Sequence, residues 1–206
     1  MREESTKRRR VFAGSGGFSV LELVIVCAVA LCLLAIMSPE FLRISYNIRL
    51  KSAAFNLSGL MQRARILAAK QNATYGIAYG AINGAEVACI DLNLSNTCNS
   101  GEPLVTFSPT ILPASGAPTG ASGQPTAYVL VGDTGTTNYD NATILAYSPR
   151  GLPCAYVSST CSIPAAGYFV YYLEDTRPDG SIGWAAVVVT RAGRTKTLTW
   201  NGSSWN

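Results

Sequence analysis

Residues 18–37 of this chain read FSVLELVIVCAVALCLLAIM, and the fold prediction starts from this stretch. Only Ser19 and Glu22 within it are not apolar. Twenty helical residues span roughly 30 Å, which is the thickness of the hydrocarbon core of a bilayer. The stretch therefore predicts a membrane-spanning helix near the N-terminus.

The residues before this stretch are basic and then small. Residues 1–17 carry five basic and two acidic side chains and end in Gly14, Ser15, Gly16 and Gly17. By the positive-inside rule, the first residues stay in the cytoplasm and the remainder of the chain is exported. A secretory signal peptide has a shorter apolar core with a cleavage site after it, and no such site follows here.

Glu22 is the one charged residue of the apolar stretch. A carboxylate inside the membrane costs at least ~2–3 kcal/mol on insertion scales, so Glu22 is expected to have a partner. The alternative is a residue at the membrane boundary that reaches the lipid headgroups.

The segment Gly17-Phe18-Ser19-Val20-Leu21-Glu22 resembles the signal of type IV prepilins, a short basic leader ending in Gly and followed by Phe, apolar residues and Glu. The resemblance implies cleavage after Gly17 by a prepilin peptidase and N-methylation of Phe18. It also implies that Glu22 neutralises the N-terminal amine of a neighbouring subunit during assembly. Pro39 falls where pilins commonly have a proline that bends the helix.

Residues 40–72 are interpreted as an amphipathic continuation of the helix that residues 18–39 begin. Apolar residues recur at spacings of three and four; they are Phe41, Ile44, Ile48, Leu57, Leu60, Met61, Ala64, Leu67 and Ala68, with Ala53 and Ala54 between them. Basic residues alternate with them: Arg43, Arg49, Lys51, Arg63, Arg65 and Lys70. A solvated or subunit-facing side is favoured over a nucleic-acid face for these cations.

From residue 73 the pattern changes to the period of two that is typical of strands. The expected strands are 74–79, 86–92, 104–107, 127–131, 143–147, 168–173, 184–190 and 195–200. Asp179-Gly180 and Ala192-Gly193 indicate hairpin turns, and residues 114–126 read as a flexible surface loop. One long helix followed by strands predicts an α+β fold, with the helix on one face of an antiparallel sheet.

Residues 60–72 (LMQRARILAAKQN) and 187–194 (VVVTRAGR) are similar to the corresponding segments of the GspH/FimT pseudopilins and minor pilins. The resemblance implies a pilin-like fold: residues 1–17 as a leader, and residues 73–206 as a β-rich periplasmic domain. It also implies a place in the inner membrane, with one membrane pass and a cytoplasmic N-terminus.

The absence of histidine excludes Ser-His-Asp and Cys-His catalysis and histidine-ligated metal sites. No enzymatic activity and no cofactor are expected. Cys27 and Cys32 lie in the apolar stretch, five positions apart, and are interpreted as small apolar residues. The other four cysteines are Cys89, Cys98, Cys154 and Cys161. An even number in an oxidising compartment predicts two disulfides, and the local pairs 89–98 and 154–161 are the simplest of three connectivities.

The sequence contains two candidate binding sites, each with a plainer explanation. Asp91, Asn93, Ser95, Thr97, Asn99 and Glu102 have the spacing of a calcium loop, although a polar hairpin loop explains the same residues. A Gly-Arg-x-Arg element binds DNA in some FimT-like proteins. The counterpart here is Gly193-Arg194-Thr195-Lys196, with Arg191 across the turn and Trp200 and Trp205 as stacking surfaces. A solvated hairpin tip is the alternative.

The expected function is that of a minor pseudopilin of a type II secretion system, assembled into a periplasmic filament. The alternative is a FimT-like minor pilin of a type IV pilus that binds and takes up DNA. The expected partners are other pilins or pseudopilins, the prepilin peptidase and the inner-membrane assembly platform, together with a secreted substrate or DNA.

Overall fold

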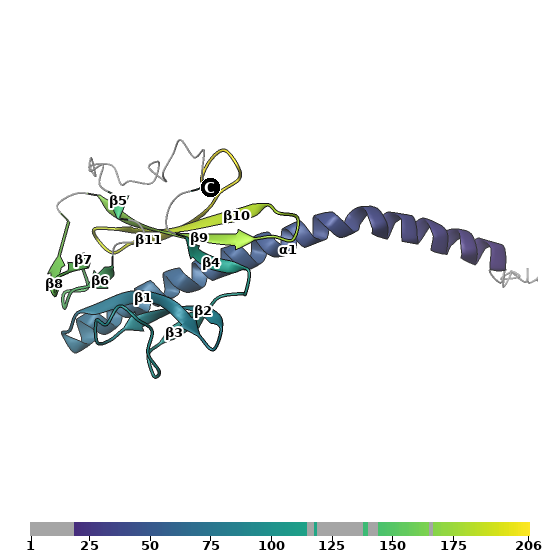
Figure 1. The fold of residues 1–206 in the computed structure, drawn as a ribbon. Helices are drawn as coiled ribbons and strands as arrows, with labels where there is room; N and C mark the ends of the chain where they lie inside the picture. Colours follow the sequence, from purple (N-terminus) through teal and green to yellow (C-terminus); the bar gives the residue numbers. More distant parts are fainter. Residues whose placement is uncertain (1–18, 115–117, 119–137, 140–143, 165–166) are drawn as a thin grey trace, which may run out of the picture. The chain divides into compact units, whose positions relative to one another are not determined.

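The computed structural model describes residues 19–114, 118, 138–139, 144–164 and 167–206. The chain forms two compact units, residues Met1–Leu42 and Arg43–Asn206. The helix α1 (Val20–Gln71) contributes to both of them, and the strands belong to the second (Figure 1).

The helix is continuous through Pro39. It ends where Asn72 adopts a left-handed conformation (φ 51°) and the backbone N–H of Ala73 donates to the carbonyl of Ala68 at 3.1 Å. Asparagine tolerates this conformation, so it is a suitable residue to end a helix. The expected end at residue 72 is thus correct to within one residue, and the bend at Pro39 stays a prediction.

Among the described residues, the strands form two sheets rather than the single sheet expected. The first has the order β3-β2-β1-β6-β7-β8 and the second has the order β11-β10-β9-β4. Neighbouring strands in both orders are antiparallel, whereas β5 runs parallel to β9. The first sheet contains β1 (Tyr75–Ile82), β2 (Ala85–Asp91), β3 (Leu104–Thr106), β6 (Leu145–Tyr147), β7 (Pro153–Val157) and β8 (Thr160–Ser162). The second contains β4 (Ile111–Ala114), β5 (Asn138–Tyr139), β9 (Tyr168–Thr176), β10 (Ile182–Thr190) and β11 (Thr195–Thr199).

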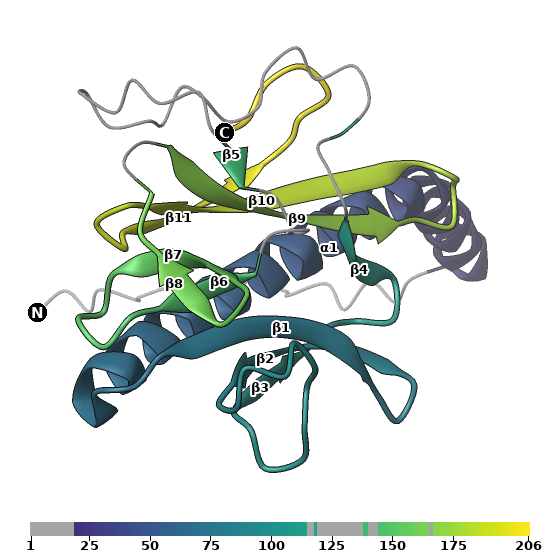
Figure 2. The ribbon, with the colours of Figure 1, turned by 60° about the vertical axis from the view of Figure 1, so that its left-hand side comes forward.

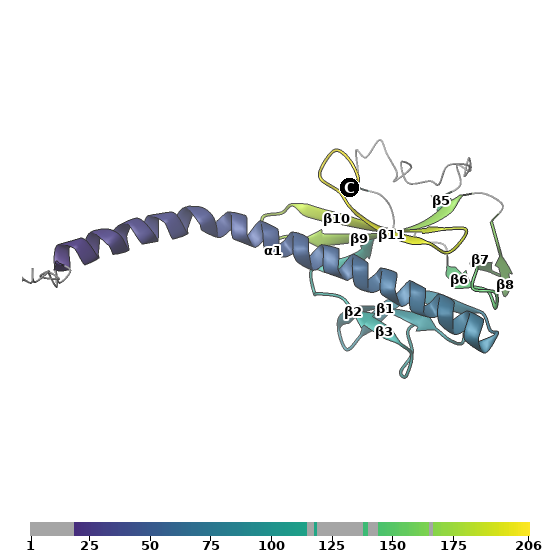
Figure 3. The same ribbon diagram turned by 180° about the vertical axis from the view of Figure 1, so that it is seen from behind.

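From Arg43 onward, α1 lies along both sheets, with β1–β3 on one side of it and β9–β11 on the other (Figures 2 and 3). Leu57, Met61 and Ala64 of the helix share one core with residues from both sheets, such as Ile90 and Phe169. The α+β class is therefore confirmed, although the helix packs against two sheets instead of one.

The central strands of the second sheet, β9 and β10, are buried on both faces. Phe169, Tyr171 and Leu173 of β9 join the core beneath the helix, whereas Val170 and Tyr172 belong to a second core on the opposite face. Because side chains alternate along a strand, residues 168–173 form an uninterrupted apolar segment instead of an alternating one.

Most of the expected strands are present in the structure, and the misses have local reasons. The expected strand at 127–131 lies outside the described residues. The strands β4 and β7 were not predicted, because Pro113 and Pro153 count against a strand in the sequence. The strands β5 and β8 are two and three residues long, too short to show a period of two.

Candidate functional site

The described start of α1, Val20–Leu34, carries an exposed apolar surface. Every described side chain from Val20 to Leu34 is exposed, including Glu22 in the first turn of the helix. Gly17 and Phe18, the residues of the predicted cleavage site, lie outside the described residues. In the part of the chain that the structure describes, no helical stretch meets the length and hydropathy required to cross a membrane.

From Arg43 onward, the same helix has two apolar stripes. One faces the core through Leu50, Leu57 and other buried residues. The other, which we call the outer ridge, consists of Ile44, Ile48, Phe55 and Ile66, which are 51%, 64%, 53% and 66% exposed. Ile48 and Ile66 are separated by five helical turns, so they point in the same direction.

The outer ridge corrects the single amphipathic stripe predicted from the sequence. Phe41, Ile44 and Ile48 were placed on the same stripe as Leu57, which is buried, but all three are exposed. At 100° per residue, Ile48 lies on the opposite side of the helix from Leu57. Spacings of three and four were satisfied by both stripes, so the periodicity did not separate them.

The basic residues of the helix were predicted to lie on a solvated or subunit-facing side, and one of the six does not. Arg43, Arg49, Lys51, Arg63 and Lys70 are exposed. Arg65 is turned toward the sheets instead. Its Nε donates to the carbonyl of Gly151 and its Nη1 donates to the carbonyl of Gly193, both at 3.0 Å. One guanidinium thus joins the helix to the β6–β7 turn of one sheet and to the β10–β11 turn of the other.

Two further polar side chains of α1 extend this contact along the β10–β11 hairpin. The hydroxyl of Ser58 donates to the Thr195 hydroxyl at 2.8 Å, and the Gln62 amide donates to the same hydroxyl at 3.0 Å. Gly193 has φ 76°, and a Cβ there would lie 2.9 Å from Cζ of Arg65. Segments 60–72 and 187–194, quoted above for the family resemblance, are therefore in direct contact through Arg65 and Gly193. The sequence showed both segments, but nothing in it indicated that they meet.

The predicted DNA site is only partly assembled. Thr195 faces the helix, so Lys196 lies on the opposite face of β11, whereas Arg194 lies in the turn before the strand; both cations are exposed. Arg191 and Lys196 have other interaction partners within the chain.

The tryptophans do not form the expected stacking surface next to these cations. Trp205 is 8% exposed and packs on Tyr172 and Trp200 with ring centroids 5.8 and 5.4 Å apart. Trp200 follows the C-terminal end of β11, whereas Arg194 precedes its start. At about 3.3 Å per residue, the two lie roughly 20 Å apart along the strand.

The predicted calcium ligands are brought into one loop, but the acidic ones are used within the chain. The Asp91 carboxylate is buried and accepts the backbone N–H groups of Ser95 at 3.1 Å and Asn96 at 2.6 Å. The Glu102 carboxylate accepts those of Leu92 at 3.0 Å and Asn99 at 2.8 Å.

The neutral residues of this loop also bond to one another. The Asn93 side chain accepts the Ser95 N–H at 3.2 Å, and the hydroxyls of Ser95 and Thr97 are 2.9 Å apart. Among the described residues, no group of three acidic, histidine or cysteine side chains is placed to hold a metal ion. This geometry favours the polar-loop explanation.

Both local disulfides are present. Cys89 is bonded to Cys98, with Cα atoms 5.6 Å apart, and Cys154 is bonded to Cys161, with Cα atoms 5.3 Å apart. The first attaches the 92–103 loop to β2, and the second links β7 to β8. Cys27 and Cys32 are free and exposed on α1, and their predicted role as small apolar residues stays a prediction.

The comparisons with known proteins add no assignment. The chain matches no family model, no curated protein and no solved structure.

Proposed function

We propose that this chain is a pilin-like subunit of a periplasmic filament, specifically a minor pseudopilin of a type II secretion system. The observation that carries the proposal is the outer ridge. Its four large apolar side chains point in one direction along about six turns of α1 and are each more than half exposed. Aligned exposed apolar side chains of this kind mark contact with a protein or a membrane. A ridge on a helix that is already anchored to its own sheets suits packing against the helix of another subunit.

In this proposal the N-terminal segment supplies the membrane anchor and the assembly signal. Prepilin peptidase cleaves after Gly17, Phe18 becomes the methylated N-terminus, and Glu22 pairs with the amine of a neighbouring subunit. A carboxylate and an ammonium that share an apolar environment are tolerated only as a pair. The two disulfides support an oxidising compartment, such as the periplasm, for the sheet domain.

The decisive test is incorporation of full-length variants into sheared filaments, measured with the companion subunits and the assembly platform present. Glu22→Ala should abolish incorporation while leaving the membrane-bound pool unchanged, and Glu22→Asp should retain part of it. Normal incorporation of Glu22→Ala would contradict the proposal.

A second pair of variants tests the ridge itself. Phe55→Asp should reduce incorporation strongly, because it places a charge in the helix–helix contact. The matched control is Asn56→Asp, the next residue, which is also exposed but off the ridge. The free energy of unfolding of both variants should lie within about 0.5 kcal/mol of the wild-type value, because neither side chain is buried. If the two variants incorporate equally well, the ridge is not the assembly surface.

DNA binding by a type IV minor pilin is retained as the second candidate, because Arg194 is exposed at the hairpin tip. A mobility-shift assay at low salt should then lose the shift with Arg194→Ala. Arg150→Ala, an exposed arginine in another turn, should keep it. An unchanged shift with Arg194→Ala would exclude this hairpin as the DNA site.

A further inference from the structure

A pocket of about 250 Å³ lies between α1 and one end of the second sheet, where β9 and β11 end and β10 begins. Its polar and aromatic walls are formed by Asn47, Lys51, Arg177, Trp184, Trp200 and Asn201, and we call it the Arg177 pocket. Pockets for drug-sized ligands and cofactors usually measure ~300–1,000 Å³. The Arg177 pocket is therefore suited to one side chain or terminal group.

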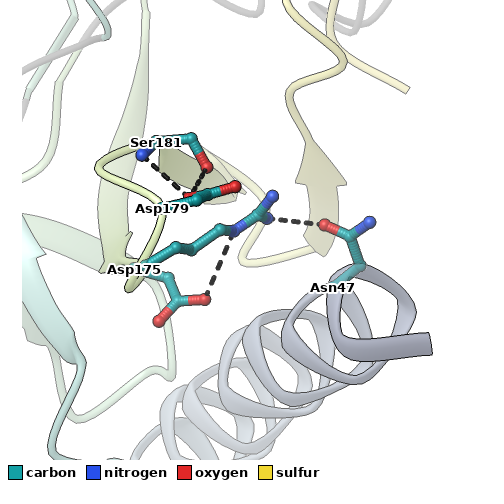
Figure 4. Close-up of polar contacts among 5 residues, drawn as sticks. Asn47, Asp175, Asp179 and Ser181 are labelled. Carbon is teal, nitrogen blue, oxygen red and sulfur yellow. Dashed lines mark hydrogen bonds and ion pairs between the residues drawn. The ribbon is translucent and has the colours of Figure 1, made fainter. Parts of the chain in front are cut away.

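Arg177 is held in place from three directions. Its Nε lies 3.8 Å from the carboxylate of Asp175, and its Nη2 donates to Oδ1 of Asn47 at 2.6 Å (Figure 4). Gly183 lies directly against the guanidinium, and a Cβ there would overlap it. The Arg177 side chain is consequently only 14% exposed.

The buried carboxylate of Asp175 stabilises the guanidinium of Arg177 in this position. Asp175 is fully buried, and its oxygens have no hydrogen-bond partner among the described residues. Removing the cation would leave a buried charge without compensation, which is strongly unfavourable. The guanidinium is thus fixed before any ligand arrives, so binding it costs little conformational entropy.

The pocket presents several donors, the Thr199 hydroxyl can donate or accept, and the two side-chain amide oxygens of the wall are already used. Oδ1 of Asn47 accepts from Arg177, and Oδ1 of Asn201 accepts the backbone N–H groups of Ser203 and Ser204 at 2.9 and 2.8 Å. Lys51 and the indoles of Trp184 and Trp200 have only donors to offer. Asp175 and Asp179 both interact with Arg177, and Asp179 also interacts with Arg43. Lys51 adds a further cation at the wall of the pocket, and its Nζ lies 6.0 Å from the ring centre of Phe55.

We propose that the Arg177 pocket binds the carboxylate of an acidic side chain in a partner polypeptide. The carboxylate accepts hydrogen bonds from Lys51 and from the fixed guanidinium of Arg177, and the two tryptophans pack on the methylene groups of the acidic residue. This goes beyond the filament proposal and does not depend on it, because no residue of the outer ridge lines the pocket.

Full-length chain in mild detergent is titrated with the peptide Ac-Gly-Gly-Glu-Gly-Gly-NH₂ and followed by tryptophan fluorescence, since two of the three tryptophans line the pocket. We expect a saturable change with the Glu peptide and none with its Gln counterpart. Lys51→Gln should weaken binding by about tenfold, the usual effect of losing one charge-assisted hydrogen bond. The control Arg63→Gln makes the same charge change elsewhere on the helix and should bind like the wild type.

A second variant keeps the test independent of Lys51. Asn47→Asp places a carboxylate of the same size beside Arg177, so it should abolish peptide binding while the fold is retained. The proposal is overturned by unchanged binding in Lys51→Gln or Asn47→Asp, by equal loss in Arg63→Gln, or by equal binding of the Gln peptide. It is also overturned if inorganic phosphate competes as well as the Glu peptide, which would indicate a general oxyanion site.

Discussion

Arg65 illustrates how a single residue can join distant parts of a chain. Its guanidinium bonds to carbonyl groups 86 and 128 positions away. In the sequence it is one of several basic residues on a helix, and it was predicted to belong with them. Arg63, two positions earlier, is exposed as predicted. The difference arises because a rotation of 200° separates the two side chains around the helix.

Arg65→Ala should lower the free energy of unfolding by about 2–3 kcal/mol, because it removes two charge-assisted hydrogen bonds that are partly buried. Arg63→Ala should change it by less than about 0.5 kcal/mol. Urea denaturation followed by circular dichroism measures both. Equal effects would show that Arg65 contributes no more than an exposed residue.

Gly193→Ala should also destabilise the protein, by about 1–2 kcal/mol, since φ 76° is strained for alanine and the added Cβ meets Arg65. In the Arg65→Ala background the steric part of this cost disappears. A double-mutant cycle should therefore give a coupling energy of at least about 0.5 kcal/mol. Strict additivity would mean that the contact is not energetically significant.

Two buried tyrosine hydroxyls make the fold sensitive to alkaline pH. Burial raises the pKa of Tyr147 well above its ordinary value, and the nearby Arg65 offsets only part of this. Burial likewise raises the pKa of Tyr79. Both phenols stay neutral when folded and ionise near pH 10 when unfolded. Stability is thus retained below about pH 10 and decreases as the pH rises further.

Tyr147→Phe tests this directly. Above pH 10 the free energy of unfolding of the wild type should fall by up to about 1.4 kcal/mol per pH unit for each buried phenol. The variant has one buried phenol fewer, so its free energy of unfolding should fall less steeply. The Tyr147 hydroxyl has no hydrogen-bond partner among the described residues, so the substitution should cost little at pH 7. Denaturation curves at pH 8, 10 and 11 give the comparison, and parallel pH profiles for both proteins would contradict it.

At the scale of elements, the strands with a clear period of two were predicted well and the short, proline-containing ones were not. The hairpins at Asp179-Gly180 and Ala192-Gly193 are both present, with Gly180 and Gly193 at positive φ. Pairing between neighbouring strands is local, so turn residues in the sequence are enough to locate it. The split into two sheets depends on long-range pairing, and no local pattern indicates it.

The two disulfides should contribute independently to the free energy of unfolding. Removing either pair by replacement with alanine should cost about 2.5 kcal/mol in the chain-entropy model. The two lie on opposite sides of the β1–β6 pair in the first sheet, so their costs should add to about 5 kcal/mol. Thermal or urea denaturation of the single and double pairs measures this. A double deletion that costs no more than one pair would show that they are coupled.

For the molecule as a whole, the N-terminus of the mature chain is the most informative measurement. Mass spectrometry of protein isolated from membranes should find Phe18 as the first residue, with one added methyl group. A chain that still begins at Met1 would contradict processing at Gly17. This result would leave the Arg177 pocket unaffected, because that proposal concerns other residues.

Spacing along the chain was enough to predict the long helix, most strands, the hairpin turns and the local disulfides, because each depends on residues close together in sequence. It could not show that Ile48 faces outward while Leu57 faces inward, or that Arg65 turns toward Gly151 and Gly193. Those outcomes depend on where the two sheets contact the helix. The same holds for the Arg177 pocket, since burial is set by partners more than a hundred residues apart.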